Sequence, residues 1–274
     1  MHEREPAVAG TFYEEDPEAL RREVMGCFSA NEPAAAKTGF IGAVVPHAGL
    51  MYSGHVAAAL YQAVELPRTA VILCPNHTGA GKAAAINLRG SWRMPFGPVP
   101  IDEALAQEIA TEEPGLEDDR AAHAREHSLE VQLPFLQILD PGIHFVPICI
   151  KSHRWDLCES IGKAIARVLA REGERGESIA MLASSDLNHY EDQRITLEKD
   201  QLAIDAILAL DARELWDRVQ RYDISMCGIL PTVAMLLAAR DLGASSAELI
   251  KHATSGDINH DYGSVVGYAS IVIR

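Results

Sequence analysis

Long apolar stretches are missing from this sequence. No run of about 18 consecutive apolar residues occurs, and the first segment, residues 1–9, is charged rather than apolar. A membrane-spanning helix needs a run of that length, and a secretory signal needs a shorter apolar segment near its start. We therefore expect a cytoplasmic protein with no membrane partner.

Paired cysteines are also missing. The cysteines are odd in number and widely scattered, and none forms a CxxC pair. This pattern argues against a disulfide framework and against a structural zinc knuckle. The residues are Cys27, Cys74, Cys149, Cys158 and Cys227.

Positive charge is scarce. The chain has 24 Lys and Arg against 39 Asp and Glu, a formal net charge of −15, so its surface repels phosphate backbones and nucleic acid is excluded as a partner. The hydrophobic fraction of 48% is ordinary for a globular protein. No repeat, low-complexity segment or linker divides the sequence, and we expect one domain over residues 1–274.

Several apolar, strand-like runs alternate with helical segments. The runs cover residues 40–45, 70–74, 144–150, 178–183 and 264–273, and a helix is expected over residues 155–171. Continuous apolar strands separated by helices predict an α/β fold with a mixed, mostly parallel central sheet and helices on both faces. In such sheets, ligands bind beyond the carboxyl ends of the strands.

Histidines follow two of these strands. His47 lies in PHAGLMYSG and His77 in CPNHTG, each after a proline and before a glycine. A single histidine is more often structural, but two at equivalent strand ends can meet around one metal ion. The pair therefore favours a metal or catalytic site.

Asp186 and His189 share the segment SSDLNHY after a further strand. A carboxylate beside an imidazole raises its basicity, so His189 is a candidate general acid or base. The alternative, equally consistent with the pattern, is that Asp186 caps a helix.

Two further signals are weaker. The spacing of His127 and Glu130 would place both on one helical face, where they could line a pocket wall or form a solvated pair. Cys227 lies beside a glycine, but the residues alone do not favour it over Cys74.

Six motifs together resemble those of the Memo family, known in microbes as AmmeMemoRadiSam system protein B. They run in order over nearly the whole chain from Arg4. The motifs are REPAVAGTFYEEDPEAL, VVPHAGLMYSG, CPNHTG, EHSLEVQLPFL, SSDLNHY and MCGILPT.

The resemblance implies a fold similar to class III extradiol ring-cleaving dioxygenases, with a non-haem iron site. The family's metal ligands fall on His47, His77 and Cys227, with Asp186 and His189 as accompanying pocket residues. The dioxygenases have a carboxylate where this chain has Cys227. A thiolate binds Fe(II) but also Cu or Zn, and would alter any oxygen chemistry.

Three functions remain open on this basis. The first is an iron-dependent redox enzyme or oxygenase acting on a small aromatic or modified-peptide substrate. The second is a non-catalytic metal- or peptide-binding protein working with radical-SAM system partners, which the family name implies. The third is a metal-dependent hydrolase with His189 as the base.

Overall fold

Buried parallel strands form the centre of the larger sheet in this computed structural model, which describes residues 3–32, 37–176 and 178–274. The strands pair in the order β2 (Gly42–Val45), β9 (Ile179–Ser184), β3 (Thr69–Pro75) and β8 (His144–Ile150). Nearly all of their residues are buried, because the sheet is covered on both faces. This explains why the four segments read as continuous apolar runs.

Antiparallel strands extend the sheet at both edges. Beside β2 lies β12 (Val265–Ile273), which also pairs with β10 (His189–Glu191) and β11 (Ala247–Thr254). Beyond β8 lie β4 (Ala84–Ile86) and β7 (Glu117–Asp118). A smaller sheet contains β1 (Glu3–Arg4) and the hairpin of β5 (Ser91–Met94) and β6 (Gly97–Pro100).

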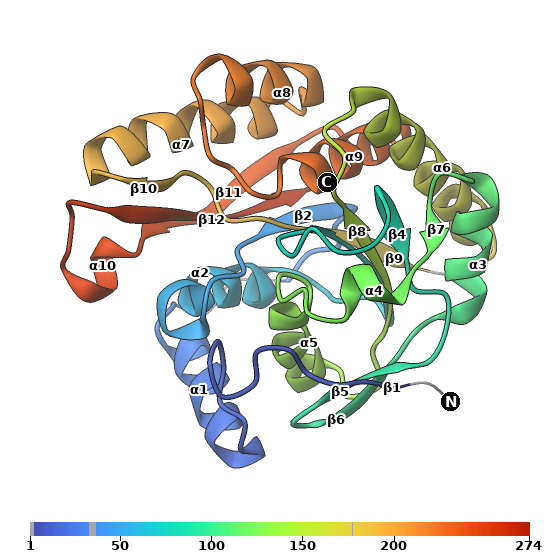
Figure 1. Cartoon of the computed structure of the whole chain (residues 1–274), viewed down its shortest axis with the longest axis horizontal. Helices are drawn as coiled ribbons and strands as arrows, with labels where there is room; N and C mark the ends of the chain where they lie inside the picture. Colours follow the sequence, from blue (N-terminus) through green and yellow to red (C-terminus); the bar gives the residue numbers. More distant parts are fainter. Residues whose placement is uncertain (1–2, 33–36, 177) are drawn as a thin grey trace.

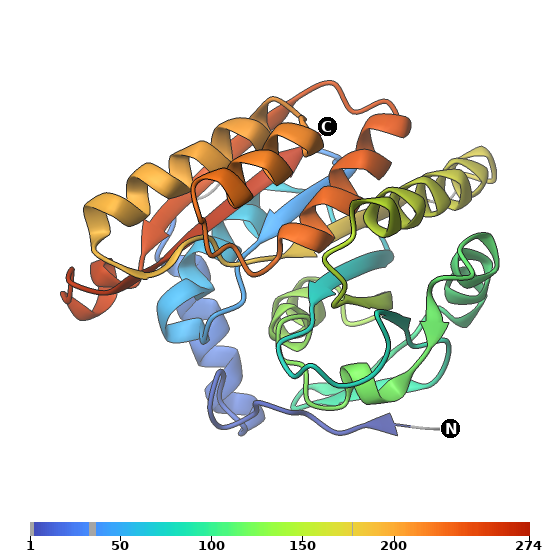
Figure 2. The same ribbon diagram turned by 45° about the horizontal axis from the view of Figure 1, so that its top comes forward.

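Helices cover both faces of the larger sheet (Figure 1, Figure 2). On one side lie α1 (Pro17–Ser29), α2 (Leu50–Ala63) and α5 (Leu133–Leu139). On the other lie α6 (Trp155–Glu174), α7 (Gln193–Leu208), α8 (Ala212–Arg221) and α9 (Ile229–Asp241). Shorter elements are α3 (Glu103–Glu112), α4 (Arg120–His123), the 3-10 helix η1 (Glu130–Gln132) and α10 (Gly256–Asn259). The predicted α/β class, with a mixed sheet between helices, is confirmed.

Close packing joins α6 to α9. A Cβ atom added at Gly162 would lie 2.6 Å from the carbonyl oxygen of Ala234 and 3.1 Å from Cβ of Leu237. Glycine at this position therefore lets the two helices approach each other over the sheet.

The order of the strands decides where the polar loops meet. Because β2, β9 and β3 are parallel neighbours, their carboxyl ends share one edge of the sheet. The loops that leave this edge carry His47, Asp186 and His77. In the described part of the chain, no helix is both long and apolar enough to span a bilayer.

Candidate metal centre

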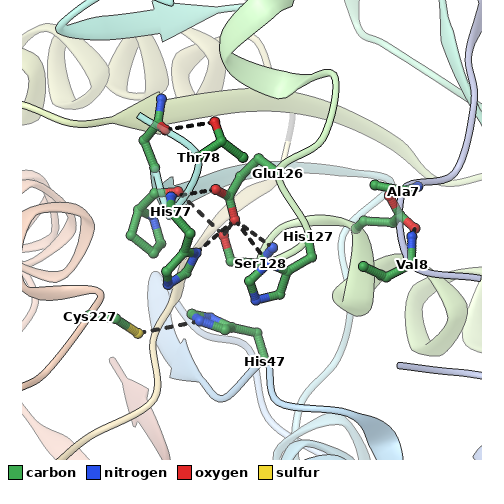
Figure 3. Close-up of polar contacts among 12 residues, drawn as sticks. Ala7, Val8, His47, His77, Thr78, Glu126, His127, Ser128 and Cys227 are labelled. Carbon is green, nitrogen blue, oxygen red and sulfur yellow. Dashed lines mark hydrogen bonds and ion pairs between the residues drawn. The ribbon is translucent and has the colours of Figure 1, made fainter. Parts of the chain in front are cut away.

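Side chains from three distant segments converge at this edge. His47 follows β2, His77 follows β3, and Cys227 lies between α8 and α9. One ligand atom from each lies within 4.8 Å of the others, and the Cys227 sulfur is 3.3 Å from His47 Nε2 (Figure 3). A sulfur and a nitrogen bound to one tetrahedral zinc ion would lie about 3.5 Å apart. The arrangement therefore has the dimensions of a mononuclear metal site.

Hydrogen bonds fix the proton of His47 on Nδ1. The Ser184 hydroxyl donates to the carbonyl oxygen of Ser128 at 2.6 Å, so its oxygen can only accept from His47 Nδ1 at 2.9 Å. This tautomer leaves the Nε2 lone pair directed at Cys227, where a metal would bind.

Gln132 fixes the position of Ser184 by hydrogen bonds. Its amide nitrogen donates to Ser184 Oγ at 3.0 Å and to the carbonyl oxygen of Pro46 at 2.9 Å. Its amide oxygen accepts from the Tyr61 hydroxyl at 2.8 Å. Gln132, Ser184 and Tyr61 are all fully buried, so water does not compete for these bonds.

Glu126 holds His77 in the same tautomer. Its carboxylate accepts from His77 Nδ1 at 2.8 Å and from the His77 backbone N–H at 2.6 Å. The Ser128 hydroxyl and backbone N–H also donate to it, at 2.7 and 3.0 Å. Burial raises the pKa of Glu126, but the hydrogen bonds from His77 and Ser128 outweigh it and hold the pKa at about 2. A histidine bonded to a carboxylate in this way is the usual arrangement of a metal ligand.

Burial sets the charge state of the donor atoms. Burial, followed by the charges of His127, His77 and His189, holds the pKa of His47 well below its usual range. Burial and the Asp186 charge raise the pKa of the Cys227 thiol. His47 is therefore neutral and ready to coordinate, whereas the thiol needs a nearby cation to ionise.

Asp186 lies beside His47 in the same group of side chains. Its Oδ1 accepts from the backbone N–H groups of His47 and Ala48 at 2.8 and 3.3 Å. Its Oδ2 is 4.0 Å from His47 Nε2. Burial raises the pKa of Asp186 to about 6, although both N–H groups act in the opposite direction. Asp186 caps no helix, because the segment continues into β10 and Asp192 caps α7.

His189 is held through its ring as well as its backbone. Nδ1 is 2.8 Å from the carbonyl oxygen of Ser225, which can only accept, so Nδ1 carries the proton. Burial lowers the pKa of His189. Its neutral ring therefore has a free Nε2 lone pair, as a general base requires.

Among these groups, His47, His77, Asp186 and His189 line a cavity of about 540 Å³, the size of a small-molecule site. Its aromatic walls are Phe12, Tyr52, Tyr190 and Tyr268, and hydroxyl or amide groups come from Thr11, Ser255, Asn259 and Ser264. No Lys or Arg is among the described residues that line it. Tyr190 has a backbone φ of 62° and a side chain that is 77% exposed.

The Memo-like protein family matches this chain over residues 4–272. This chain belongs to the Memo family. A MEMO1 family protein of Methanopyrus kandleri is 44% identical to it, with 99% of each chain covered. One from Methanothermobacter thermautotrophicus is 40% identical, over 98% of this chain and 99% of its own.

A solved structure shows the same fold. An uncharacterized protein of Escherichia coli K12 matches the Memo chain with a TM-score of 0.58, covering 86% of this chain and all of its own. The two sequences are 16% identical, so the match concerns the fold.

His127 lines the cavity described above, but Glu130 does not. The expected shared helical face is wrong, because His127 precedes η1 and its ring stacks on His77 with centroids 4.7 Å apart. Glu130 faces the N-terminal segment, where Arg4 and the Tyr13 hydroxyl each bond to its carboxylate at 2.6 Å. Glu130 is therefore a buried structural carboxylate and not part of the pocket wall.

The sequence did not point to the residues that orient the ligands. Glu126 is adjacent to His127 in a recognisable motif, and its position beside a histidine is the one available signal. Gln132 and Ser184 belong to apolar or capping patterns and carry no sign of their role. Ser184 contacts His47 across 137 residues of chain, and Gln132 contacts Ser184 across 52.

Proposed function

We propose that this Memo-family protein binds one transition-metal ion, iron(II) in preference to copper or zinc, through His47, His77 and Cys227. We further propose that it is a redox enzyme or oxygenase for a small aromatic or modified-peptide substrate. The observation that carries the proposal is that hydrogen bonds to the buried side chains of Ser184 and Glu126 engage Nδ1 of both imidazoles and leave each Nε2 as the available donor atom beside one thiol.

The donor set fits such an ion. Two neutral imidazoles and one thiolate supply three ligands and a single negative charge, which suits a divalent cation. When bound, the ion would offer open positions for substrate and dioxygen. His77 is exposed, which leaves the site accessible from the cavity.

The remaining residues of the cavity would prepare a substrate. His189 can accept a proton at Nε2 and return it later in the reaction. The Asp186 carboxyl, with a pKa of about 6, can share a proton at neutral pH. The partly exposed rings of Phe12 and Tyr52 line the cavity and give apolar surfaces on which an aromatic group can lie.

A second candidate is a peptide-binding protein that does not turn over. It is favoured by exposed apolar side chains near the cavity mouth, because Tyr190, Ile258 and Tyr262 are all solvent-exposed. Asn259, between the last two, lines the cavity. Such rims suit a segment of another protein, including a partner in a radical-SAM system.

Metal content after anaerobic purification tests the proposal. We expect about one equivalent of iron in the native protein, and loss of it in His47→Ala and Cys227→Ser. The exposed His144→Ala variant is the matched control and should retain the metal. Iron lost from His47→Ala alone would remove Cys227 from the ligand set. No metal in any sample, and no uptake of Fe(II), Cu(I) or Zn(II), would contradict the proposal.

Oxygen uptake separates the two functions. Iron-loaded protein should consume dioxygen when a catechol or a tyrosine-containing peptide is added, and His189→Gln should slow this by at least about a hundredfold. Binding of the same peptide without oxygen uptake would support the second candidate.

A further inference from the structure

Ser225 holds His189 at two points. The His189 backbone N–H donates to Ser225 Oγ at 2.7 Å, and ring Nδ1 donates to the Ser225 carbonyl oxygen at 2.8 Å. Ser225 itself is exposed, so water competes for both bonds. Something else must therefore fix Ser225 if the ring is to stay in place.

The buried side chain of Asn188 supplies that support. Its Oδ1 accepts from both the backbone N–H and the hydroxyl of Ser225, each at 3.1 Å. Its amide nitrogen donates to Glu191 Oε2 at 2.7 Å. Because a carboxylate only accepts, this bond orients the amide with its oxygen towards Ser225. Asn188 is fully buried, so water competes less for these part-buried bonds than for the exposed bonds between Ser225 and His189.

The buried Asp200, paired with the partly exposed His252, anchors Asn188 from outside the cavity. Asp200 Oδ1 accepts from the Asn188 backbone N–H at 2.9 Å, and Asp200 Oδ2 accepts from His252 Nε2 at 2.8 Å. The side chain of Asp200 is fully buried. It fits only because residue 267 is glycine, since a Cβ there would lie 1.9 Å from Asp200 Oδ2.

We propose that Asn188, anchored by Asp200 and His252, is a positioning residue for His189. Acting through Ser225, it fixes the His189 ring with the proton on Nδ1 and leaves Nε2 free. This inference rests on the proposed function in one respect, since His189 is taken as the acid or base of the cavity.

The expected effect of Asn188 is on the tautomer of the His189 ring. A neutral imidazole can carry its proton on either nitrogen, and the partner of one nitrogen selects the state of the other. If Ser225 moves, Nδ1 loses its acceptor and the proton can transfer to Nε2, which then no longer accepts a proton from a substrate. Asn188 is neither one of the described residues that line the cavity nor a member of the candidate metal cluster, so its loss should leave the metal site assembled.

Nitrogen-15 NMR of the full-length protein labelled at histidine tests this directly. The ring signals of His189 are assigned by their loss in His189→Gln. In the native protein we expect His189 to carry its proton on Nδ1 and to have an unprotonated Nε2. In Asn188→Ala the ratio of Nδ1–H to Nε2–H should fall about tenfold, the effect of losing one hydrogen bond.

A second test uses variants of Ser225, an exposed residue whose substitution should leave the fold intact. Ser225→Ala should change the His189 signals in the same direction, and Ser225→Thr, which keeps the hydroxyl, should restore them. Asn31→Ala is the matched control, because the Asn31 amide also makes part-buried hydrogen bonds to backbone carbonyl groups but lies beyond the end of α1, away from His189. It should lower the melting temperature and leave the His189 signals unchanged.

Spectra recorded without metal and with one equivalent of Zn²⁺ separate this inference from the proposed function. Unchanged His189 signals in Asn188→Ala and Ser225→Ala would overturn the positioning role, whatever the metal content. If Zn²⁺ is not taken up but the tautomer shifts as expected, the positioning role stands and the metal function fails.

Discussion

Glu126 is the residue on which His77 depends most directly. Its carboxylate accepts from both the ring and the backbone of His77, so Glu126→Gln would remove the charge and the preferred acceptor of Nδ1. Loss of such a partner typically weakens metal affinity 10- to 100-fold. We expect a decrease in this range, measured by competition with a chromogenic chelator. Glu117→Gln, at an exposed ion pair with Lys82, should have no effect, and equal affinities for the two variants would contradict the role of Glu126.

His123 makes the stability of the fold sensitive to acid. Burial and then the Arg4 charge lower the pKa of His123 from 6.5 to about 4. The unfolded chain therefore binds more protons than the folded one between these values, and stability falls as the pH decreases through this window. Between pH 7 and pH 5 the native protein should lose about 2 kcal/mol more than His123→Phe, which keeps a ring against Trp92. Urea unfolding of metal-free samples at both pH values would measure it, and parallel losses would refute it.

At the scale of elements, the contact of α6 with α9 depends on one glycine. Gly162→Ala would force a Cβ against the backbone of Ala234, and overpacking of this kind costs about 1–3 kcal/mol. Gly173 lies in the same helix with no atom within 4 Å of its added Cβ, so Gly173→Ala should stabilise by up to about 1 kcal/mol. Chemical denaturation of the two variants gives the comparison. Destabilisation by both would mean that helix geometry, rather than packing, is responsible.

Elements defined by local pattern could be predicted from the sequence. The run at residues 144–150 coincides with β8, because a strand buried on both faces is apolar throughout. The helix expected around His127 does not form, and the reason is local. Glu126 draws the Ser128 N–H into a turn, and α5 begins only at Leu133, with proline in its first turn.

Only part of the candidate site could be predicted from the sequence. His47 and His77 each follow an apolar strand, and their position at one edge of the sheet could be predicted, because the carboxyl ends of parallel strands share an edge. The role of Glu130 could not, because its partner Arg4 is 126 residues away in the sequence and only folding brings the two together. Asn188 likewise acts through Ser225, 37 residues further along the chain.

At the scale of the whole molecule, the three proposed ligands join segments that are 30 to 180 residues apart, since His47, His77 and Cys227 leave different parts of the sheet and helix layers. A metal that binds only the folded chain stabilises it by about 2.7 kcal/mol when present at 100 times its dissociation constant. We expect Zn²⁺ to raise the melting temperature of the native protein, measured by calorimetry, and not that of Cys227→Ser. Equal shifts in both proteins would indicate metal bound elsewhere.

Tyr190 has a consequence for how this molecule could be altered. Its left-handed backbone conformation costs a non-glycine residue about 1–2 kcal/mol, and its exposed ring gains little from packing. Tyr190→Gly should therefore make the fold more resistant to heat while opening one wall of the cavity. Selection for thermal resistance alone would discard this ring, and selection for ligand retention would keep it, so Tyr190 marks a position where the two pressures conflict.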